Sequence, residues 1–270
     1  MRIASWNVNS IRTRVSRVVD WMERADVDVL CMQEIKCKPE QFPYQQFEEA
    51  GYEVQAHGLN QWNGVAIASR LPMTDVRLQL PEQPGYANTG DPVVEARAMS
   101  ADVEGVRLWS LYVPNGRDLG HPHLQYKLDW LRVLRQEAER TSGDLVAYLG
   151  DFNIAPLDGD VWDMAAFEGS THVSQPERDA FNALLGAGLQ DVVRDYAEGY
   201  TYWDYKAGRW PKNEGMRIDF VLTTGSLADL VTDASIHRDE RAGDAPSDHV
   251  PVVVDLDLET ELDDDRPMIF

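Results

Sequence analysis

The chain has few cysteines, no long apolar run and few basic residues for its number of acidic ones. Its two cysteines, Cys31 and Cys37, have neither zinc-site spacing nor the number needed for a disulfide framework. No apolar run approaches the ~18 residues of a membrane-spanning helix, and the N-terminus has no apolar signal core. We therefore expect a protein of the reducing cytoplasm, without a signal peptide or a transmembrane segment.

Basic side chains are scarce, with 25 Lys and Arg against 46 Asp and Glu, which gives a net charge of −21. Such a surface repels polyanions on average, so a nucleic-acid partner would need a locally favourable site or metal ions. Part of the excess lies in residues 259–270 (ETELDDDRPMIF), which we interpret as a flexible acidic tail. We expect a single catalytic domain over residues 1–258.

Three motifs of common enzyme classes are also missing. The sequence has no GxxxxGK[ST], GxSxG or HExxH segment, which disfavours P-loop NTPases, α/β-hydrolases and zinc proteases of the HExxH type. Ser247, Asp248 and His249 are adjacent, so in a strand their side chains would alternate and could not form a catalytic triad by themselves.

Short apolar runs alternate with amphipathic stretches along the chain. Strands are predicted at residues 2–6, 29–33, 64–69, 94–100, 106–113, 145–149, 217–223 and 250–258, and helices at 15–24, 124–140 and 177–185. Strands outnumber helices, and helices recur between them. The pattern predicts an α/β fold with sheets covered by helices.

Polar residues recur where the predicted strands end. They are Asn7, Glu34, Tyr112, Asn115, Asp151, Asn153, Asp219, Asp248 and His249. If the strands are aligned, these side chains converge on one rim, and four crowded carboxylates require cations or protons. Oxygen ligands without cysteine favour Mg²⁺, with Mn²⁺ as a substitute. His249 could protonate a leaving group or stabilise an oxyanion, with Asp219 fixing its tautomer, which suits metal-assisted phosphate-ester hydrolysis.

Eight motifs together suggest a known family. In chain order they are SWNVNSIR, QEIK, NGVAIAS, YVPNG, GDFN, YWDY, MRIDF and SDHVPV. Over residues 2–258 the chain resembles the endonuclease/exonuclease/phosphatase superfamily, and within it the exodeoxyribonuclease III and abasic-site endonuclease branch. The resemblance implies a four-layered sandwich of two packed mixed sheets flanked by helices.

The resemblance also implies roles for the residues at the rim. Glu34 corresponds to the principal metal ligand, with Asn7 and Asp248 nearby and Asp151 and Asn153 as further candidates. Asp151 would orient or deprotonate the attacking water, or protonate the leaving group, and Asn153 would hold that water or a phosphate oxygen. Tyr112 and Asn115 would contact phosphate, and His249, paired with Asp219, would stabilise the transition state.

A second implied feature is a pocket for a baseless sugar. Tyr202, Met216 and Ile218 would wall it, with Trp203 and Arg217 as further substrate contacts. The phosphate footprint would come from basic residues near the motif loops, namely Arg12, Arg14, Lys36, Arg117, Lys127, Lys206, Arg209, Lys212 and Arg217. Methionine replaces the bulky aromatic residue of some relatives at position 216, and the chain is more acidic than is typical of the family.

The implied activity is Mg²⁺-dependent incision of duplex DNA 5′ to abasic sites, leaving a 3′-hydroxyl. Removal of blocked 3′ ends and 3′→5′ exonuclease activity would accompany it, and we expect a monomer that binds no membrane. Two alternatives remain open: a related phosphoesterase acting on inositol phosphates or sphingolipids, and a catalytically weakened DNA-binding or docking module.

Overall fold

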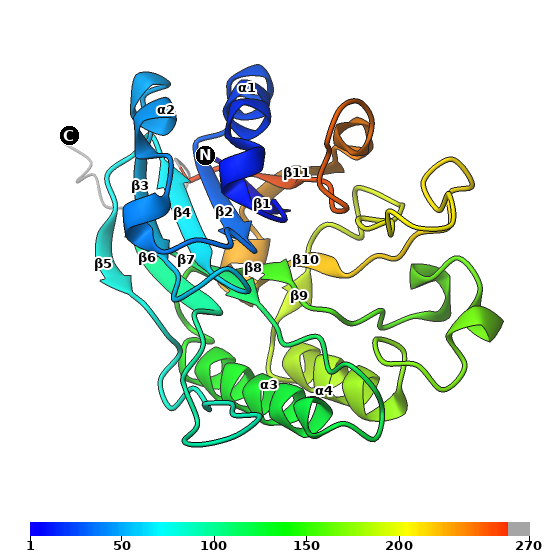
Figure 1. Cartoon of the computed structure of the whole chain (residues 1–270). Coiled ribbons are helices and arrows are strands. Elements are labelled where there is room, and N and C mark those ends of the chain that lie inside the picture. Colours follow the sequence, from blue (N-terminus) through cyan, green and yellow to red (C-terminus); the bar gives the residue numbers. More distant parts are fainter. Residues whose placement is uncertain (259–270) are drawn as a thin grey trace.

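The computed structural model describes residues 1–258, so the expected acidic tail lies outside the described residues. Two six-stranded sheets form its centre (Figure 1). The first has the order β11-β12-β1-β2-β4-β3 and consists of β1 (Arg2–Asn7), β2 (Val29–Gln33), β3 (Glu53–His57), β4 (Val65–Ser69), β11 (Val231–Ile236) and β12 (Val252–Leu256). The second has the order β5-β6-β7-β8-β10-β9 and consists of β5 (Thr74–Arg77), β6 (Ala98–Val103), β7 (Val106–Tyr112), β8 (Val146–Asp151), β9 (Gln190–Asp191) and β10 (Asp219–Thr223).

Each sheet mixes parallel and antiparallel neighbours. In the first sheet β1 runs parallel to β2 and antiparallel to β12, and in the second β7 runs parallel to β8, which is antiparallel to β10. Parallel neighbours end at the same edge, so the residues that follow β1 and β2 lie side by side, as do those that follow β7 and β8.

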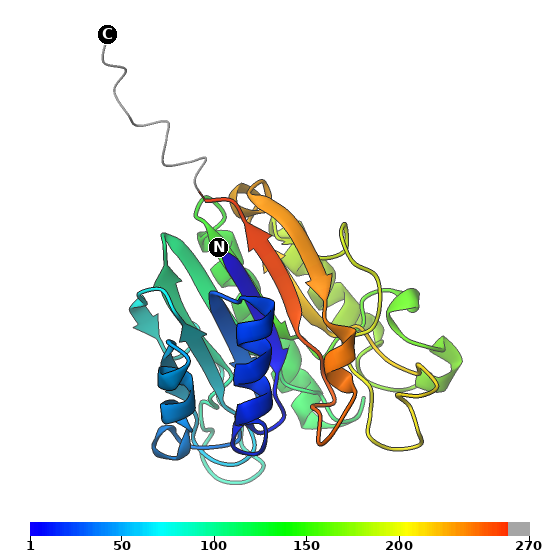
Figure 2. The ribbon, with the colours of Figure 1, turned by 90° about the horizontal axis from the view of Figure 1, so that it is seen from above.

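Helices cover the outer faces of both sheets. The α-helices are α1 (Val15–Ala25), α2 (Tyr44–Glu49), α3 (Pro122–Arg140), α4 (Gln175–Gly186) and α5 (Gly225–Ala228), and the 3₁₀ turns are η1 (Ile11–Thr13), η2 (Pro39–Gln41), η3 (Asp158–Asp160), η4 (Met164–Phe167) and η5 (Arg238–Arg241). Figures 1 and 2 show α1 and α2 over the first sheet and α3 and α4 over the second. The predicted four-layered sandwich is confirmed.

The core follows the alternation of side chains along the strands. In β1, Ile3 packs between the two sheets, whereas Ala4 and Trp6 pack against the helices of the first sheet. In β8, Ala147 and Leu149 face the first sheet, whereas Tyr148 packs toward the helices of the second. This two-residue period sets which strand-end side chains point into the space between the sheets.

Two element starts differ from prediction for identifiable reasons. The strand expected from Val94 begins at Ala98, because Val93 makes an isolated bridge with Tyr86 outside the sheet. The helix predicted over residues 124–140 begins at Pro122 instead of Leu124, where His121 accepts a hydrogen bond from the backbone N–H of His123 and caps it. No helix of the described residues is long and apolar enough to cross a lipid bilayer, and both cysteines are free thiols in the interior.

Candidate active site

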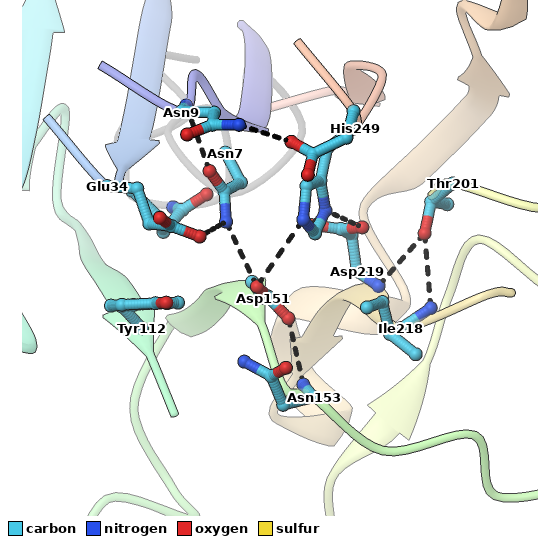
Figure 3. A network of polar contacts seen from close by, with 12 residues as sticks. Asn7, Asn9, Glu34, Tyr112, Asp151, Asn153, Thr201, Ile218, Asp219 and His249 are labelled. Atoms are coloured by element: carbon cyan, nitrogen blue, oxygen red, sulfur yellow. Dashed lines mark hydrogen bonds and ion pairs between the residues drawn. The ribbon is translucent and has the colours of Figure 1, made fainter. Parts of the chain in front are cut away.

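The core between the sheets ends in polar side chains at the edge where β1 and β8 finish. Alternation along β1 carries the series of Ile3 on to Asn7, and alternation along β8 carries the series of Leu149 on to Asp151. The two polar ends meet across the sheets, where Asn7 Nδ2 donates to Asp151 Oδ2 at 3.0 Å (Figure 3). The site is therefore assembled by the packing of the two sheets against each other.

Strand register places two further residues beside Asp151. Tyr112 of β7 and Asp219 of β10 are its direct partners in the second sheet. Gly150, in the GDFN segment, permits the close approach of β8 to β7, because a Cβ there would lie 1.9 Å from the Leu111 carbonyl oxygen.

His249 lies between two carboxylates. Its Nδ1 is 2.8 Å from Asp219 Oδ2, and its Nε2 is 3.7 Å from Asp151 Oδ2 (Figure 3). Thr201 supports the arrangement, since its hydroxyl accepts from the backbone N–H of Asp219 at 3.1 Å. The backbone carbonyl of His249 accepts from Trp6 Nε1 at 3.1 Å, which ties the histidine to the first sheet.

These contacts set the protonation of the pair. Burial alone would lower the pKa of His249, but the carboxylates of Asp219 and Asp151 outweigh it and raise that pKa to about 10. Burial, with Asp219 and Glu34 nearby, raises the pKa of Asp151 to about 7, against the opposing effect of His249. At neutral pH the site thus holds an imidazolium beside a carboxyl group poised to gain or lose a proton.

Glu34 follows β2 with its backbone in the left-handed region, at φ 51°. Asn7 Nδ2 donates to its Oε1 at 2.8 Å, and Lys36 Nζ lies 2.7 Å from its Oε2. Burial would raise the pKa of Glu34, but Lys36 and Asn7 outweigh burial and lower the pKa, so Glu34 is ionised. A non-glycine residue held in this conformation is common at functional sites.

Glu34, Asp151 and His249 each offer a ligand atom within 4.8 Å of the others. Because His249 is protonated, the two carboxylates are the better ligands. Asn7 turns its Nδ2 toward both of them, and its Oδ1 accepts from the backbone N–H of Asn9 at 3.0 Å. A set of oxygen donors with negative charge fits a hard divalent cation. Asp248, also predicted as a ligand, lies outside this trio, and its Oδ1 accepts from Asn9 Nδ2 at 2.9 Å.

Asn153 and Asn115 occupy the next loop positions. The Asn153 backbone N–H donates to Asp151 Oδ1 at 2.9 Å, its Nδ2 donates to the Val113 carbonyl at 3.0 Å, and its Oδ1 accepts from Asn115 Nδ2 at 3.0 Å. An amide group carries two N–H donors, so one remains for a water or a phosphate oxygen.

Tyr112 stays a protonated hydroxyl. Burial and the nearby carboxylate of Glu34 raise its pKa well above the ordinary value, and the guanidinium of Arg97 lies 4.8 Å from its ring centroid. A phenol of this kind can donate a hydrogen bond to a phosphate oxygen.

A pocket of about 380 Å³ opens beside the catalytic group. Tyr202 and Met216 line it as predicted, and the ring centroid of Tyr202 lies 4.9 Å from that of His249. Ile218 packs behind this wall in the same apolar cluster and is 2% exposed. Trp162 and Arg209, which sequence reasoning did not assign to the pocket, complete one side with the guanidinium 4.7 Å from the Trp162 ring centroid.

Three predicted DNA contacts are instead buried. Trp203 has no exposed surface and packs edge-on against Trp210. Arg217 is 3% exposed and pairs with Asp191 at 3.0 Å. Lys127 is fully buried in α3. The presence of aromatic and basic residues near the motif loops therefore did not predict which of these side chains are buried.

Sequence reasoning also missed residues that the structure brings to the site. Asn9 links Asp248 to Lys36, and its place in the SWNVNSIR motif was the only signal for it. His172, to which the sequence assigned no role, is partly buried with Nε2 3.2 Å from Asn153 Oδ1. No pattern in the sequence connects His172 to GDFN.

Comparisons with known proteins agree with this geometry. Residues 4–249 match the Endonuclease/Exonuclease/phosphatase family. Exodeoxyribonuclease III of Haemophilus influenzae is 28% identical, over 93% of this chain and 98% of that protein. The structure of an AP endonuclease from Archaeoglobus fulgidus is 33% identical with a TM-score of 0.88, covering 96% of this chain and 100% of that one.

A 3′ phosphatase from Neisseria, NExo, solved with a product DNA hairpin, is 34% identical with a TM-score of 0.88. It covers 95% of this chain and 99% of that one. The chain therefore belongs to the endonuclease/exonuclease/phosphatase family, as a phosphodiester-cleaving nuclease of the exodeoxyribonuclease III type.

Proposed function

We propose that this nuclease is Mg²⁺-dependent and repairs DNA by incising duplexes 5′ to abasic sites, with cleaning of blocked 3′ ends as an associated activity. The observation that carries the proposal is the protonated His249, held by Asp219 beside Asp151, with Glu34 within 4.8 Å. The pocket lined by Tyr202 and Met216 supports an abasic substrate. A nucleotide without a base costs little free energy to extrude from the duplex, and it is small enough to enter this pocket.

The residues have complementary tasks in this reaction. Glu34 and Asp151, oriented by the Nδ2 donor of Asn7, would hold Mg²⁺, which would supply Lewis-acid stabilisation of the developing phosphate charge. Asp151 can accept a proton from the attacking water, since its pKa of about 7 lies close to neutral pH. His249 donates its Nε2 proton in a hydrogen bond to a phosphate oxygen while Asp219 holds Nδ1.

Bond changes follow from these positions. Water forms the new P–O bond and gives a proton to Asp151, the bond from phosphorus to the 3′ oxygen breaks, and that oxygen takes a proton from solvent water and leaves as a 3′-hydroxyl. Tyr112 and the free N–H of Asn153 can hold the remaining phosphate oxygens. A blocking group at a 3′ end presents the same P–O linkage to the same side chains, which accounts for 3′-end cleaning by one site.

The test is cleavage of a labelled duplex carrying one stable abasic analogue, beside an intact control duplex. We expect incision 5′ to the analogue with Mg²⁺, none with chelator, and a loss of about 10²-fold or more in His249→Ala. His57→Ala is the matched control, because His57 lies on the edge strand β3 and should retain activity.

Other outcomes point elsewhere. Degradation of both duplexes from the 3′ end would make exonuclease the main activity. If neither duplex is cleaved, the DNA proposal fails, and hydrolysis of inositol phosphates or sphingomyelin under the same conditions would establish the first alternative.

A further inference from the structure

A fully buried ion pair lies behind the catalytic loops. Lys127 of α3 and Glu177 of α4 each have 0% exposed side-chain surface, and Lys127 Nζ pairs with Glu177 Oε1. Neither residue reaches the pocket or the phosphate-binding side of the site, so the chemistry described above does not use them directly.

All three contacts of the Lys127 ammonium are accounted for. Besides Glu177, Nζ donates to the backbone carbonyl of Asn153 at 2.6 Å and lies 3.3 Å from that of Asn115. An ammonium group has three donors, so its capacity is used in full. One buried side chain therefore holds the backbones of both asparagines predicted to contact phosphate.

Glu177 anchors the pair to a third segment. Its Oε2 accepts from the hydroxyl of Ser174 at 2.5 Å, at the start of α4. The same loop is joined to the segment after β8, where the Ala155 backbone N–H donates to the His172 carbonyl at 2.8 Å. The loop after β7, the loop after β8 and the loop before α4 thus meet at one buried ion pair.

Stability alone is a weak reason for such a pair. Removing two charges from water costs several kcal/mol per ion, and well-packed apolar residues often serve as well or better. The local backbone gives a stronger reason, because Asn153 sits in the left-handed region at φ 52° and its N–H must stay aimed at Asp151. A donor fixed on its carbonyl holds that peptide in a conformation that non-glycine residues seldom adopt.

We propose that Lys127 and Glu177 are positioning residues, which fix Asn115 and Asn153 and through them the orientation of Asp151. The inference rests on the proposed function, because it assigns the pair to the same phosphodiester cleavage. Displacement of a catalytic group by about 1 Å can cost about 10²-fold in rate. Loss of the ion pair should therefore lower kcat, while the pocket and the KM for the abasic duplex stay largely unchanged.

The decisive comparison separates position from stability. We expect Lys127→Met to lower both the Tm and kcat, because Glu177 is left as an unpaired buried charge. Lys127→Met combined with Glu177→Met removes both charges, so the double variant should regain stability relative to Lys127→Met. Its kcat should stay about 10-fold to 100-fold below wild type, with KM within about threefold, because neither carbonyl regains its donor.

Glu177→Gln is the milder variant in case Lys127→Met does not fold, since it keeps the shape and one acceptor. Glu137→Gln is the matched control: Glu137 is a buried carboxylate of the same helix, paired with Arg140 at 2.7 Å and remote from the catalytic loops. It should lower the Tm while kcat stays within about twofold of wild type.

Kinetics are measured with Mg²⁺ on the abasic duplex at a temperature where every variant is folded by circular dichroism. Recovery of kcat together with the Tm in the double variant would reduce the pair to a structural role and overturn the inference. So would a Glu177→Gln enzyme that loses stability but keeps its full kcat. Cleavage by the wild type in the same experiment shows that the proposed function holds, so the two failures are distinguishable.

Discussion

At the scale of single residues, the charge of His249 depends on its neighbours. A buried imidazole by itself would be neutral, and only the carboxylates on both ring nitrogens make it cationic. The sequence permitted a prediction of the Asp219–His249 pairing, because both residues stand at strand ends. It did not predict the contact of Asn7 with Asp151, which depends on how two sheets pack.

Asp219→Asn should move the alkaline limit of activity. In the wild type His249 is protonated below a pKa of about 10, so activity that needs the imidazolium is lost as pH rises through that value. The amide removes the charge of Asp219 that raises the pKa, so the limit should shift to lower pH and kcat should fall by about 10²-fold. A pH profile of kcat at saturating DNA measures this, and an unshifted alkaline limb would show that the reaction does not require the protonated form of His249.

Glu34→Ala should change the metal requirement more than the chemistry. The variant keeps Asp151 and Asn7 but loses the ionised carboxylate of the predicted ligand set. We expect almost no cleavage at low Mg²⁺ and partial recovery at high Mg²⁺, because the remaining oxygens bind the ion less tightly. Titration of activity with Mg²⁺ tests this, and full activity in chelator would exclude a metal role.

At the scale of elements, prediction succeeded where burial was continuous. The central strands β2, β4 and β8 are buried along their whole length and were visible as apolar runs. The edge strand β5 is exposed at every position, and in β11 only Ala234 is buried, so neither carries a continuous apolar signal. These segments are strands because their backbones pair with a neighbouring strand. That pairing cannot be recognised from the residues of the segment alone.

Gly150→Ala should destabilise the fold next to the site. The added Cβ would meet the Leu111 carbonyl oxygen at 1.9 Å, and a backbone atom cannot swing aside as a side chain can. Separation of β7 from β8 should lower the free energy of unfolding by about 3 kcal/mol and displace Asp151 from Tyr112.

Gly143→Ala is the control for this prediction, because nothing lies within 4 Å of a Cβ at that position. Urea denaturation compares the two variants. Equal midpoints would mean that the strands separate at little cost and that Gly150 is not required for their packing.

At the scale of the whole molecule, the acidic surface limits how DNA can be held. Several basic residues expected to contact phosphate are already paired with carboxylates of the protein, such as Lys36 with Glu34 and Arg217 with Asp191. Few phosphate contacts imply a shallow dependence of affinity on salt, since each neutralised phosphate contributes about −0.9 to the slope. The sequence showed that acidic residues outnumber basic ones, but it did not show that basic side chains form ion pairs with carboxylates of the same protein.

Removal of residues 259–270 should strengthen DNA binding at low salt. Five of these residues are acidic and one is basic, so the segment adds to the negative charge that opposes a polyanion. The gain should disappear near 1 M salt, where the Debye length is about 3 Å. Binding of the abasic duplex by fluorescence anisotropy in chelator, across a salt series, measures the effect without cleavage. A full-length variant with the five acidic residues changed to Asn or Gln separates charge from length. If it binds like the wild type while the truncated chain binds tighter, the segment acts by occupying space, and charge repulsion is not the reason.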